Sequence, residues 1–172
     1  DGATFRNVGN YLTGRLQKDD MIFAHMSNFV WSEEYSTETL LAHLNSTLHR
    51  HIINGLNPGL HYEVGDGKRL PIKEEIQSAS ELKKLVDEGI NRRLTLSELI
   101  ETSADFDPET FAEIIRESPV DHLPFTEEKI NAELMLLHGT VDNLLFEEYD
   151  ISEETQANMY TNLPKNTAQF NH

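Results

Sequence analysis

The sequence contains no cysteine, which excludes disulfides, thiolate metal sites and cysteine nucleophiles. It has no uninterrupted apolar run of about 18 residues, so it offers no segment typical of a membrane-spanning helix. The chain starts at Asp1 without an initiator methionine, and its first residues lack the pattern of a signal peptide. We therefore expect a cytoplasmic protein and interpret the chain as a piece of a larger one.

Basic residues are scarce, because 14 lysines and arginines stand against 30 acidic residues among 172. Residues 1–93 hold 13 acidic and 11 basic residues, whereas residues 94–172 hold 17 and 3, a net charge of −14. A nucleic-acid backbone would be repelled by the second part and accepted only by the first. We predict two parts divided at residue 93, the second of them acidic and helical.

Acidic residues are missing altogether between Glu38 and Glu63. In so acidic a chain, this window indicates either a surface that meets an anion or a segment that is buried. The residues alone leave both interpretations open.

An amphipathic helix is predicted from Ser36 or Thr37 to Gly55. Either Ser36 or Thr37 can cap its start, and Gly55 is a plausible end. The spacing of its apolar residues is that of one buried face, which consists of Leu40, Leu41, Leu44, Leu48 and Ile52. We expect Leu44 and Leu48 to lie in the core, with His43 and Arg50 at least partly exposed.

The other elements follow from turn and cap signals. The sequence predicts one or two strands within Met21–Val30 and a turn at Asn57-Pro58-Gly59. A short strand over Leu60–Val64 should follow, and then a tight turn at Gly65–Gly67 from which Lys68 and Arg69 project. Helices are expected from Pro71, Thr95, Asp107, Thr126 (the longest) and Ile151, with a linker over 118–124 and a loose tail after Pro164. The predicted fold class is α+β, mostly helical, with a small mixed sheet near the N-terminus.

No catalytic, metal or cofactor motif stands out in the residues. His49 and His51 would point roughly 200° apart on a helix, so they cannot face one metal ion together. Gly65-Asp66-Gly67-Lys68 is too short for a phosphate-binding loop. We therefore predict no catalytic residue, no metal ligand and no cofactor-binding residue in this chain.

Three segments, in order, resemble the C-terminal part of adenine-specific DNA methyltransferases, of the bacteriophage-exclusion and fused restriction–methylation types. The first is Leu40-Leu-Ala-His-Leu-Asn-Ser-Thr-Leu48. The most specific is Leu56-Asn-Pro-Gly-Leu-His-Tyr-Glu-Val-Gly-Asp66 with Leu70-Pro-Ile72. The third combines Glu101-Thr-Ser-Ala-Asp-Phe106 with Val141-Asp-Asn-Leu-Leu-Phe-Glu-Glu-Tyr149. Two departures are Ala104, where relatives tend to have Trp, and Asp150, where Gly usually follows the Tyr, although Asp can adopt the left-handed conformation.

The resemblance implies that residues 1–93 form the DNA-recognition part of such an enzyme, active in phage defence or restriction–modification. The expected partners are double-stranded DNA and the upstream methyltransferase domain. The catalytic motif and the loop for the methyl donor S-adenosylmethionine would lie upstream, because neither is in this chain. The expected DNA-binding residues are Arg50, Asn57, Lys68 and Arg69.

Two alternatives accompany this interpretation. Arg92 and Arg93 could contact DNA, or they could complement the dipole at a helix end. The whole chain could also be an acidic protein-interaction module or a DNA mimic without DNA contact. Recognition requires the basic residues of 50–93 to converge on one face, whereas mimicry requires carboxylates along an exposed face.

Overall fold

A three-stranded sheet lies at the N-terminal end of the fold, as predicted, but it is purely antiparallel rather than mixed. The computed structural model describes residues 2–9, 12–17, 27–100, 103, 105–117 and 123–162. The strands are β1 (Gly2–Arg6), β2 (Gly14–Gln17) and β3 (Ser27–Val30), in the order β2-β1-β3. Alternation along β1 places Ala3 and Phe5 in the core, so the intervening residues belong to the other face.

Two helices replace the single one predicted after Ser36. They are α1 (Thr37–Asn45) and α2 (Thr47–Leu56), and the extended backbone of Ser46 separates them. The Ser46 hydroxyl caps α2 by accepting a hydrogen bond from His49 N (3.1 Å). Asn45 is held by Gly14 of β2, whose N–H donates to Asn45 Oδ1 (3.0 Å). Contacts with distant residues therefore stabilise the break.

The segment after α2 is less regular than predicted. The strand expected over Leu60–Val64 is reduced to one bridge between Val8 and His61, and α3 (Val64–Gly67) is a single helical turn. The helix expected from Pro71 begins only at Ala79, and this helix, α4 (Ala79–Glu98), continues through the cap predicted at Thr95. That prediction was wrong because the Thr95 hydroxyl donates to Asn91 O within the helix (3.1 Å).

The remaining helices largely confirm the predicted starts. Asp107 caps α5 (Pro108–Glu117) by accepting a hydrogen bond from Glu109 N (3.0 Å). The longest helix is α6 (Leu123–Glu148), which begins three residues before Thr126, and α7 (Glu153–Asn162) follows Ser152. Asp150 has the left-handed conformation (φ 54°), and Ile151 N donates to Phe146 O (2.9 Å), which closes α6.

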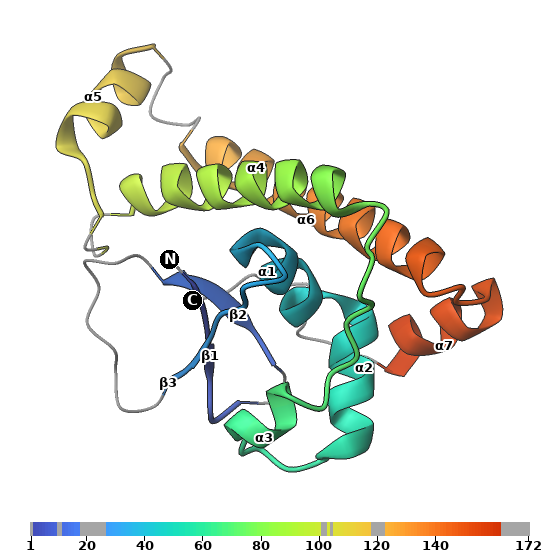
Figure 1. Ribbon diagram of the computed structural model, residues 1–172. Coiled ribbons are helices and arrows are strands. Elements are labelled where there is room, and N and C mark those ends of the chain that lie inside the picture. The colour runs from blue at the N-terminus through green and yellow to red at the C-terminus, as the bar shows by residue number, and fades with distance from the viewer. Residues whose placement is uncertain are drawn as a thin grey trace.

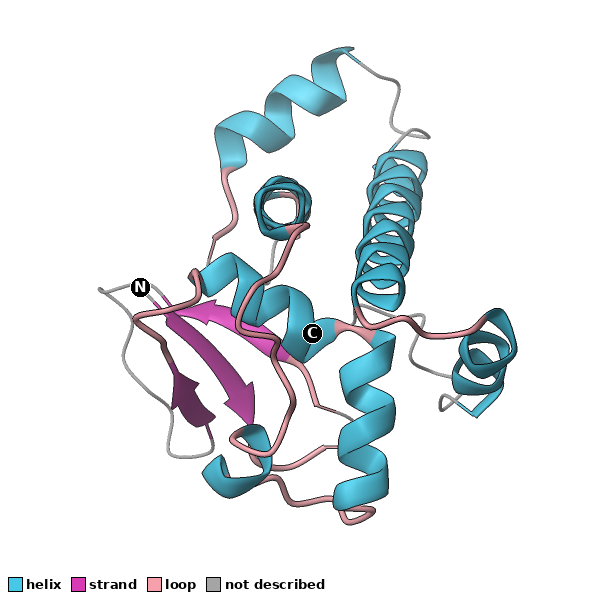
Figure 2. Cartoon of the chain, turned by 45° about the vertical axis from the view of Figure 1, so that its right-hand side comes forward, coloured by secondary structure: helices cyan, strands magenta, loops and turns pink. Residues whose placement is uncertain are grey.

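Helices α1, α4 and α6 stack on one face of the sheet (Figure 1). Helix α1 lies against the sheet, and α4 and α6 lie beyond it (Figure 2). One hydrophobic core joins the sheet to α1 and Tyr62, and a second joins Ala42 of α1 to α4 and α6 through Leu82, Val141 and Leu145. The boundary predicted at residue 93 falls inside α4, so the two parts share a helix and a core.

Some sequence predictions fall on residues that are not described. These are the first part of Met21–Val30, most of the 118–124 linker, Ala104, and the tail after Pro164. Within the described part of the chain, no helix combines the length and apolar character needed to cross a membrane.

Candidate nucleic-acid interface

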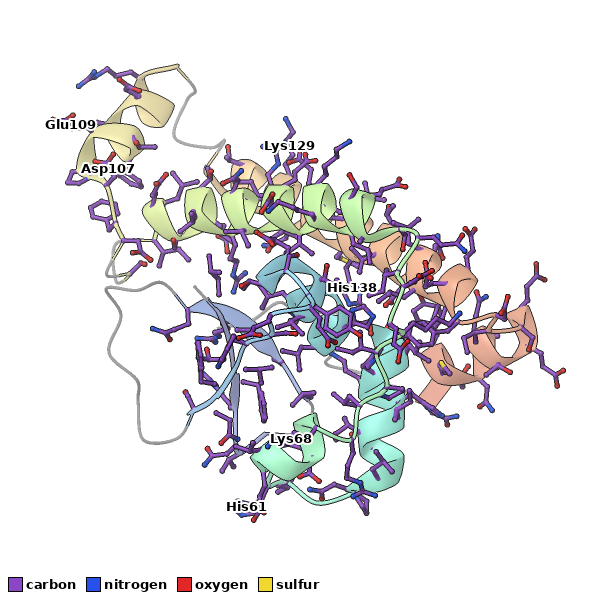
Figure 3. The ribbon with its side chains drawn as sticks, viewed as in Figure 1. His61, Lys68, Asp107, Glu109, Lys129 and His138 are labelled. Atoms are coloured by element: carbon purple, nitrogen blue, oxygen red, sulfur yellow. The ribbon has the colours of Figure 1, made fainter. Side chains whose placement is uncertain are left out.

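Lys68 and Arg69, which directly follow helix α3, are exposed to solvent, as the sequence predicted. Figure 3 shows Lys68 and His61 in the lower part of the molecule. Residues 60–62 pair with the chain that continues β1, because Gly9 N donates to Leu60 O (2.9 Å) and Tyr62 N to Asn7 O (2.8 Å). Neither Lys68 nor Arg69 has an ion-pair partner among the described residues. The turn therefore carries two exposed cations at the end of the sheet.

A close approach to the sheet fixes the position of α3. A side chain at Gly67 would come within 3.2 Å of the Phe5 ring, tighter than most carbon contacts, so glycine lets the turn lie directly on β1. Asp66 closes the turn by accepting hydrogen bonds from Glu63 N (2.9 Å) and Asn57 Nδ2 (2.8 Å). These two bonds lower the pKa of the Asp66 carboxyl.

Asn57 holds this loop together rather than presenting its amide to solvent. Its Nδ2 group donates to His61 O (2.7 Å) and to Asp66 Oδ2, and its Oδ1 accepts from Gly59 N (3.0 Å). Both N–H donors of the amide are therefore used. Bidentate recognition of adenine needs one of them, so Asn57 is not placed to read a base in this conformation.

Arg50 and His43 are buried, and the prediction that they are partly exposed was wrong. Arg50 is 4% exposed, and its Nε donates to Leu12 O (3.2 Å). His43 is 1% exposed. The acid-free window over α1 and α2 is thus largely a buried segment. Arg50 cannot reach a phosphate without leaving the core, so we remove it from the candidate DNA contacts. Leu44 and Leu48 are buried as predicted.

A polar cluster surrounds His43 and His49 at the junction of α1 and α2. His49 Nε2 donates to Pro71 O (2.7 Å), and its Nδ1 lies 3.0 Å from Ser46 Oγ. His43 Nδ1 donates to Thr39 O (2.7 Å), and its Nε2 lies 3.2 Å from the Tyr149 hydroxyl. Burial is the main cause that lowers the pKa of both imidazoles, that of His49 to about 4.

This cluster is structural. His43, Ser46 and His49 are each at most 1% exposed, so no substrate can reach the Ser46 hydroxyl or either imidazole. Across the described residues, no group of three or more histidine or carboxylate side chains could hold a metal ion. His51, on the same helix as His49, is exposed, in line with the opposite directions predicted for the two side chains.

The outer face of the sheet carries arginines that the sequence analysis missed. Arg15 of β2 lies opposite Thr4 of β1, so Arg6, two residues further along β1, is on the same face. Both arginines are exposed. Partial desolvation of its guanidinium is the largest cause that lowers the pKa of Arg15, and the positive charges of Arg6 and Arg93 lower this pKa further. Arg93 of α4 therefore lies near enough to Arg15 to repel it. The sequence feature that could have revealed this face is the alternation of polar and apolar residues along 2–6 and 14–17.

Phe29 of β3 completes this face. It pairs with Thr4 in the β1–β3 register and is 39% exposed. Its ring covers Gly2, where a side chain would clash at 2.3 Å. Trp31, just beyond β3, is 60% exposed. Exposed arginine side chains on one sheet suit contact with the phosphates of a nucleic acid.

The other cations of 50–93 are dispersed. Lys83 pairs with Glu38 (2.5 Å) and Asp87 (3.4 Å), and Lys73 donates to Glu148 O. Arg92 lies 2.8 Å from Glu133 of α6, although its Nε–H is not aligned for a hydrogen bond. Arg92 therefore joins α4 to α6 instead of ending a helix. The basic residues of 50–93 do not converge on one face by themselves, so the grouping of exposed cations depends on Arg6 and Arg15.

Comparisons of the chain with models of protein families, with curated proteins and with solved structures find no match.

Proposed function

We propose that this chain recognises double-stranded DNA as the C-terminal portion of an S-adenosylmethionine-dependent adenine-N6 DNA methyltransferase. The observation that carries the proposal is the position of exposed cations that form no salt bridge among the described residues, although the charge of Arg69 acts on the nearby Asp66 carboxyl. Arg6 and Arg15 lie on the sheet, and Lys68 and Arg69 lie on the turn at its end. The methyltransferase context rests on the resemblance of the Leu56–Asp66 and Leu70–Ile72 segments.

In this proposal the sheet positions the DNA and the turn reads it. Arginines on the rigid strands contact phosphates, which fixes the register of the protein without sequence preference. Arg69, on a turn that projects beyond the sheet, is the candidate for a bidentate contact with guanine in the major groove. The acidic part, residues 94–172, stays away from the phosphates because its net charge of −14 opposes their approach.

The methyl donor and the target adenine are assigned to the upstream domain. The chain has neither the catalytic Asn/Asp-Pro-Pro-aromatic motif nor a glycine-rich donor loop. We predict that residues 1–172 bind no S-adenosylmethionine. Isothermal calorimetry should show only heats of dilution, and a saturable isotherm would contradict this division of roles.

A direct test of the DNA proposal is fluorescence anisotropy of a labelled mixed-sequence duplex titrated with the chain. We expect binding at low salt that weakens in the Lys68→Ala/Arg69→Ala variant. Lys84→Ala is the matched control, because Lys84 is an exposed lysine on α4 without an ion pair among the described residues. Equal affinities for the wild type, the double variant and the control would remove the turn from the interface.

The rival function is an acidic interaction module or DNA mimic, which the charge of residues 94–172 favours. Its carboxylates do not all line an exposed face, however. Asp142 is fully buried, Glu133 pairs with Arg92, and Glu148 accepts a hydrogen bond from Ser78 Oγ (3.1 Å). We therefore prefer DNA recognition. Inhibition of a DNA-binding enzyme by the chain, without binding of the duplex, would favour the rival.

A further inference from the structure

The outer face of α6 is apolar although it lies in the most acidic part of the chain. Leu136 is 73% exposed and Met135 is 53% exposed, the former being the most exposed large hydrophobic residue described. The face consists of Ala132, Met135, Leu136, Gly139, Thr140 and Asn143, and the Thr140 hydroxyl is already bonded to Leu136 O (3.0 Å). An uncharged stripe of this kind on an exposed helix is typical of a surface that packs against another element.

The acidic residues of α6 between Glu128 and Glu147 do not lie on this outer face. Two acids occur in α6 between Glu128 and Glu147. Glu133 is paired with Arg92 of α4, and Asp142 points into the core, where it accepts a hydrogen bond from Thr47 N (2.7 Å). The outer face therefore carries no carboxylate over about 27 Å, given the rise of 1.5 Å per residue. This pattern fits a helix partner better than a solvated acidic surface.

Gly139 lies in the middle of this face, and no contact within the chain explains it. A Cβ atom built at Gly139 would meet nothing within 4 Å. Glycine in the interior of a helix is less favourable than alanine. Alanine would fit the isolated chain without a clash, so the glycine suits a second helix that approaches closely from outside.

Lys129 and Glu147 lie at the two ends of the face. They are 18 residues apart, which is five turns of 3.6 residues, so they project from the same side of α6. Neither makes an ion pair among the described residues. The position midway between them is His138, whose ring points to the opposite side, toward Asn45 O (3.0 Å), while Lys129 points away from the body (Figure 3).

We propose that the outer face of α6 binds a second copy of this chain, with the two α6 helices antiparallel across a two-fold axis near residue 138. This arrangement places Lys129 of each copy opposite Glu147 of the other, and Leu136 and Gly139 of both copies at the crossing. The pairing is isologous, as symmetric dimers require. One pair of helices buries less than a standard interface, so the dimer is weak and forms in a concentration-dependent way.

The test is sedimentation equilibrium of the 172-residue chain from about 5 to about 500 µM, a range in which mass action reveals a weak dimer. Lys129→Glu and Glu147→Lys should each weaken dimerisation about tenfold, because each creates two like-charged pairs. The variant with both changes should regain the affinity of the wild type. Lys84→Glu, the same charge change on α4, should have no effect. A monomer at every concentration, or a dimer indifferent to the exchanged charges, would overturn the proposal.

Gly139→Ala separates a packing role from a folding role. Alanine favours the helix, so the variant should unfold at a higher temperature while its dimer dissociates more easily. Leu136→Glu should abolish the dimer and leave the monomer folded, because this side chain is exposed. An alanine at position 139 that leaves the dimer unchanged would contradict close approach of two α6 helices there.

Discussion

At the scale of single residues, the buried polar side chains around Ser46 define how α1, α2 and α6 meet. Thr47 N and its hydroxyl both donate to Asp142 (2.7 and 2.5 Å), and the Tyr160 hydroxyl donates to the same carboxylate (3.2 Å). His49 uses both ring nitrogens in the neutral form. Because Thr47, His49 and Asp142 are buried, each of their hydrogen bonds offsets a desolvation cost that its loss would restore.

The pH dependence of stability should report His49. Its pKa is about 4 in the folded protein against the ordinary 6.5, so the folded state binds fewer protons than the unfolded state between these values. The free energy of unfolding should therefore fall by up to about 1.4 kcal/mol per pH unit as pH drops from 6.5 to 4. His49→Gln should flatten this slope in urea titrations. His51→Gln, on the exposed side of α2, should retain it, and equal slopes in the two variants would contradict burial of a neutral His49.

Asp142→Asn should destabilise the chain by about 2–3 kcal/mol, because three donors converge on a charged acceptor that the amide only partly replaces. Thermal or urea unfolding measures the change. Glu154→Gln on the exposed surface of α7 is the control and should have little effect. An unchanged midpoint for Asp142→Asn would mean that the carboxylate does not join α6 to α2.

At the scale of elements, the apolar spacing of 40–52 predicts a buried face correctly but conceals the break at Ser46. The break depends on Gly14 and Asp142, which hold Asn45 and Thr47 from 31 and 95 residues away in sequence. A local pattern contains neither contact. In contrast, the starts of α5 and α7 depend on caps within a few residues, so Asp107 and Ser152 are readable directly from the sequence.

Leu48→Ala should cost about 2–5 kcal/mol in the free energy of unfolding, because the side chain is 3% exposed in a core cluster with Phe146 and Met159. Leu56→Ala, at the exposed end of the same helix, provides the comparison and should cost much less. Urea midpoints that move equally in both variants would show that α2 does not bury the predicted face.

At the scale of the whole molecule, charge separates one end from the other. Exposed cations occupy the sheet and α3, while α6 and α7 carry exposed carboxylates such as Glu147, Glu153 and Glu154. Sequence composition predicts this division. Composition does not predict which cations are accessible to DNA, since Arg50 is buried and Arg92 and Lys83 form ion pairs with glutamates. Arg6 and Arg15 join one face only once the register of β1 and β2 is known.

The salt dependence of DNA binding tests the proposed interface most directly. If Arg6, Arg15 and Lys68 each neutralise a phosphate while Arg69 contacts a base, the logarithm of the binding constant should fall against log salt with a slope of about −2.7. The Lys68→Ala/Arg69→Ala variant should give a slope of about −1.8, and Lys84→Ala should keep the slope of the wild type. Anisotropy titrations of one duplex between about 50 and about 200 mM salt supply all three values. A wild-type slope near zero, or a double variant with an unchanged slope, would contradict DNA recognition by the sheet and its turn.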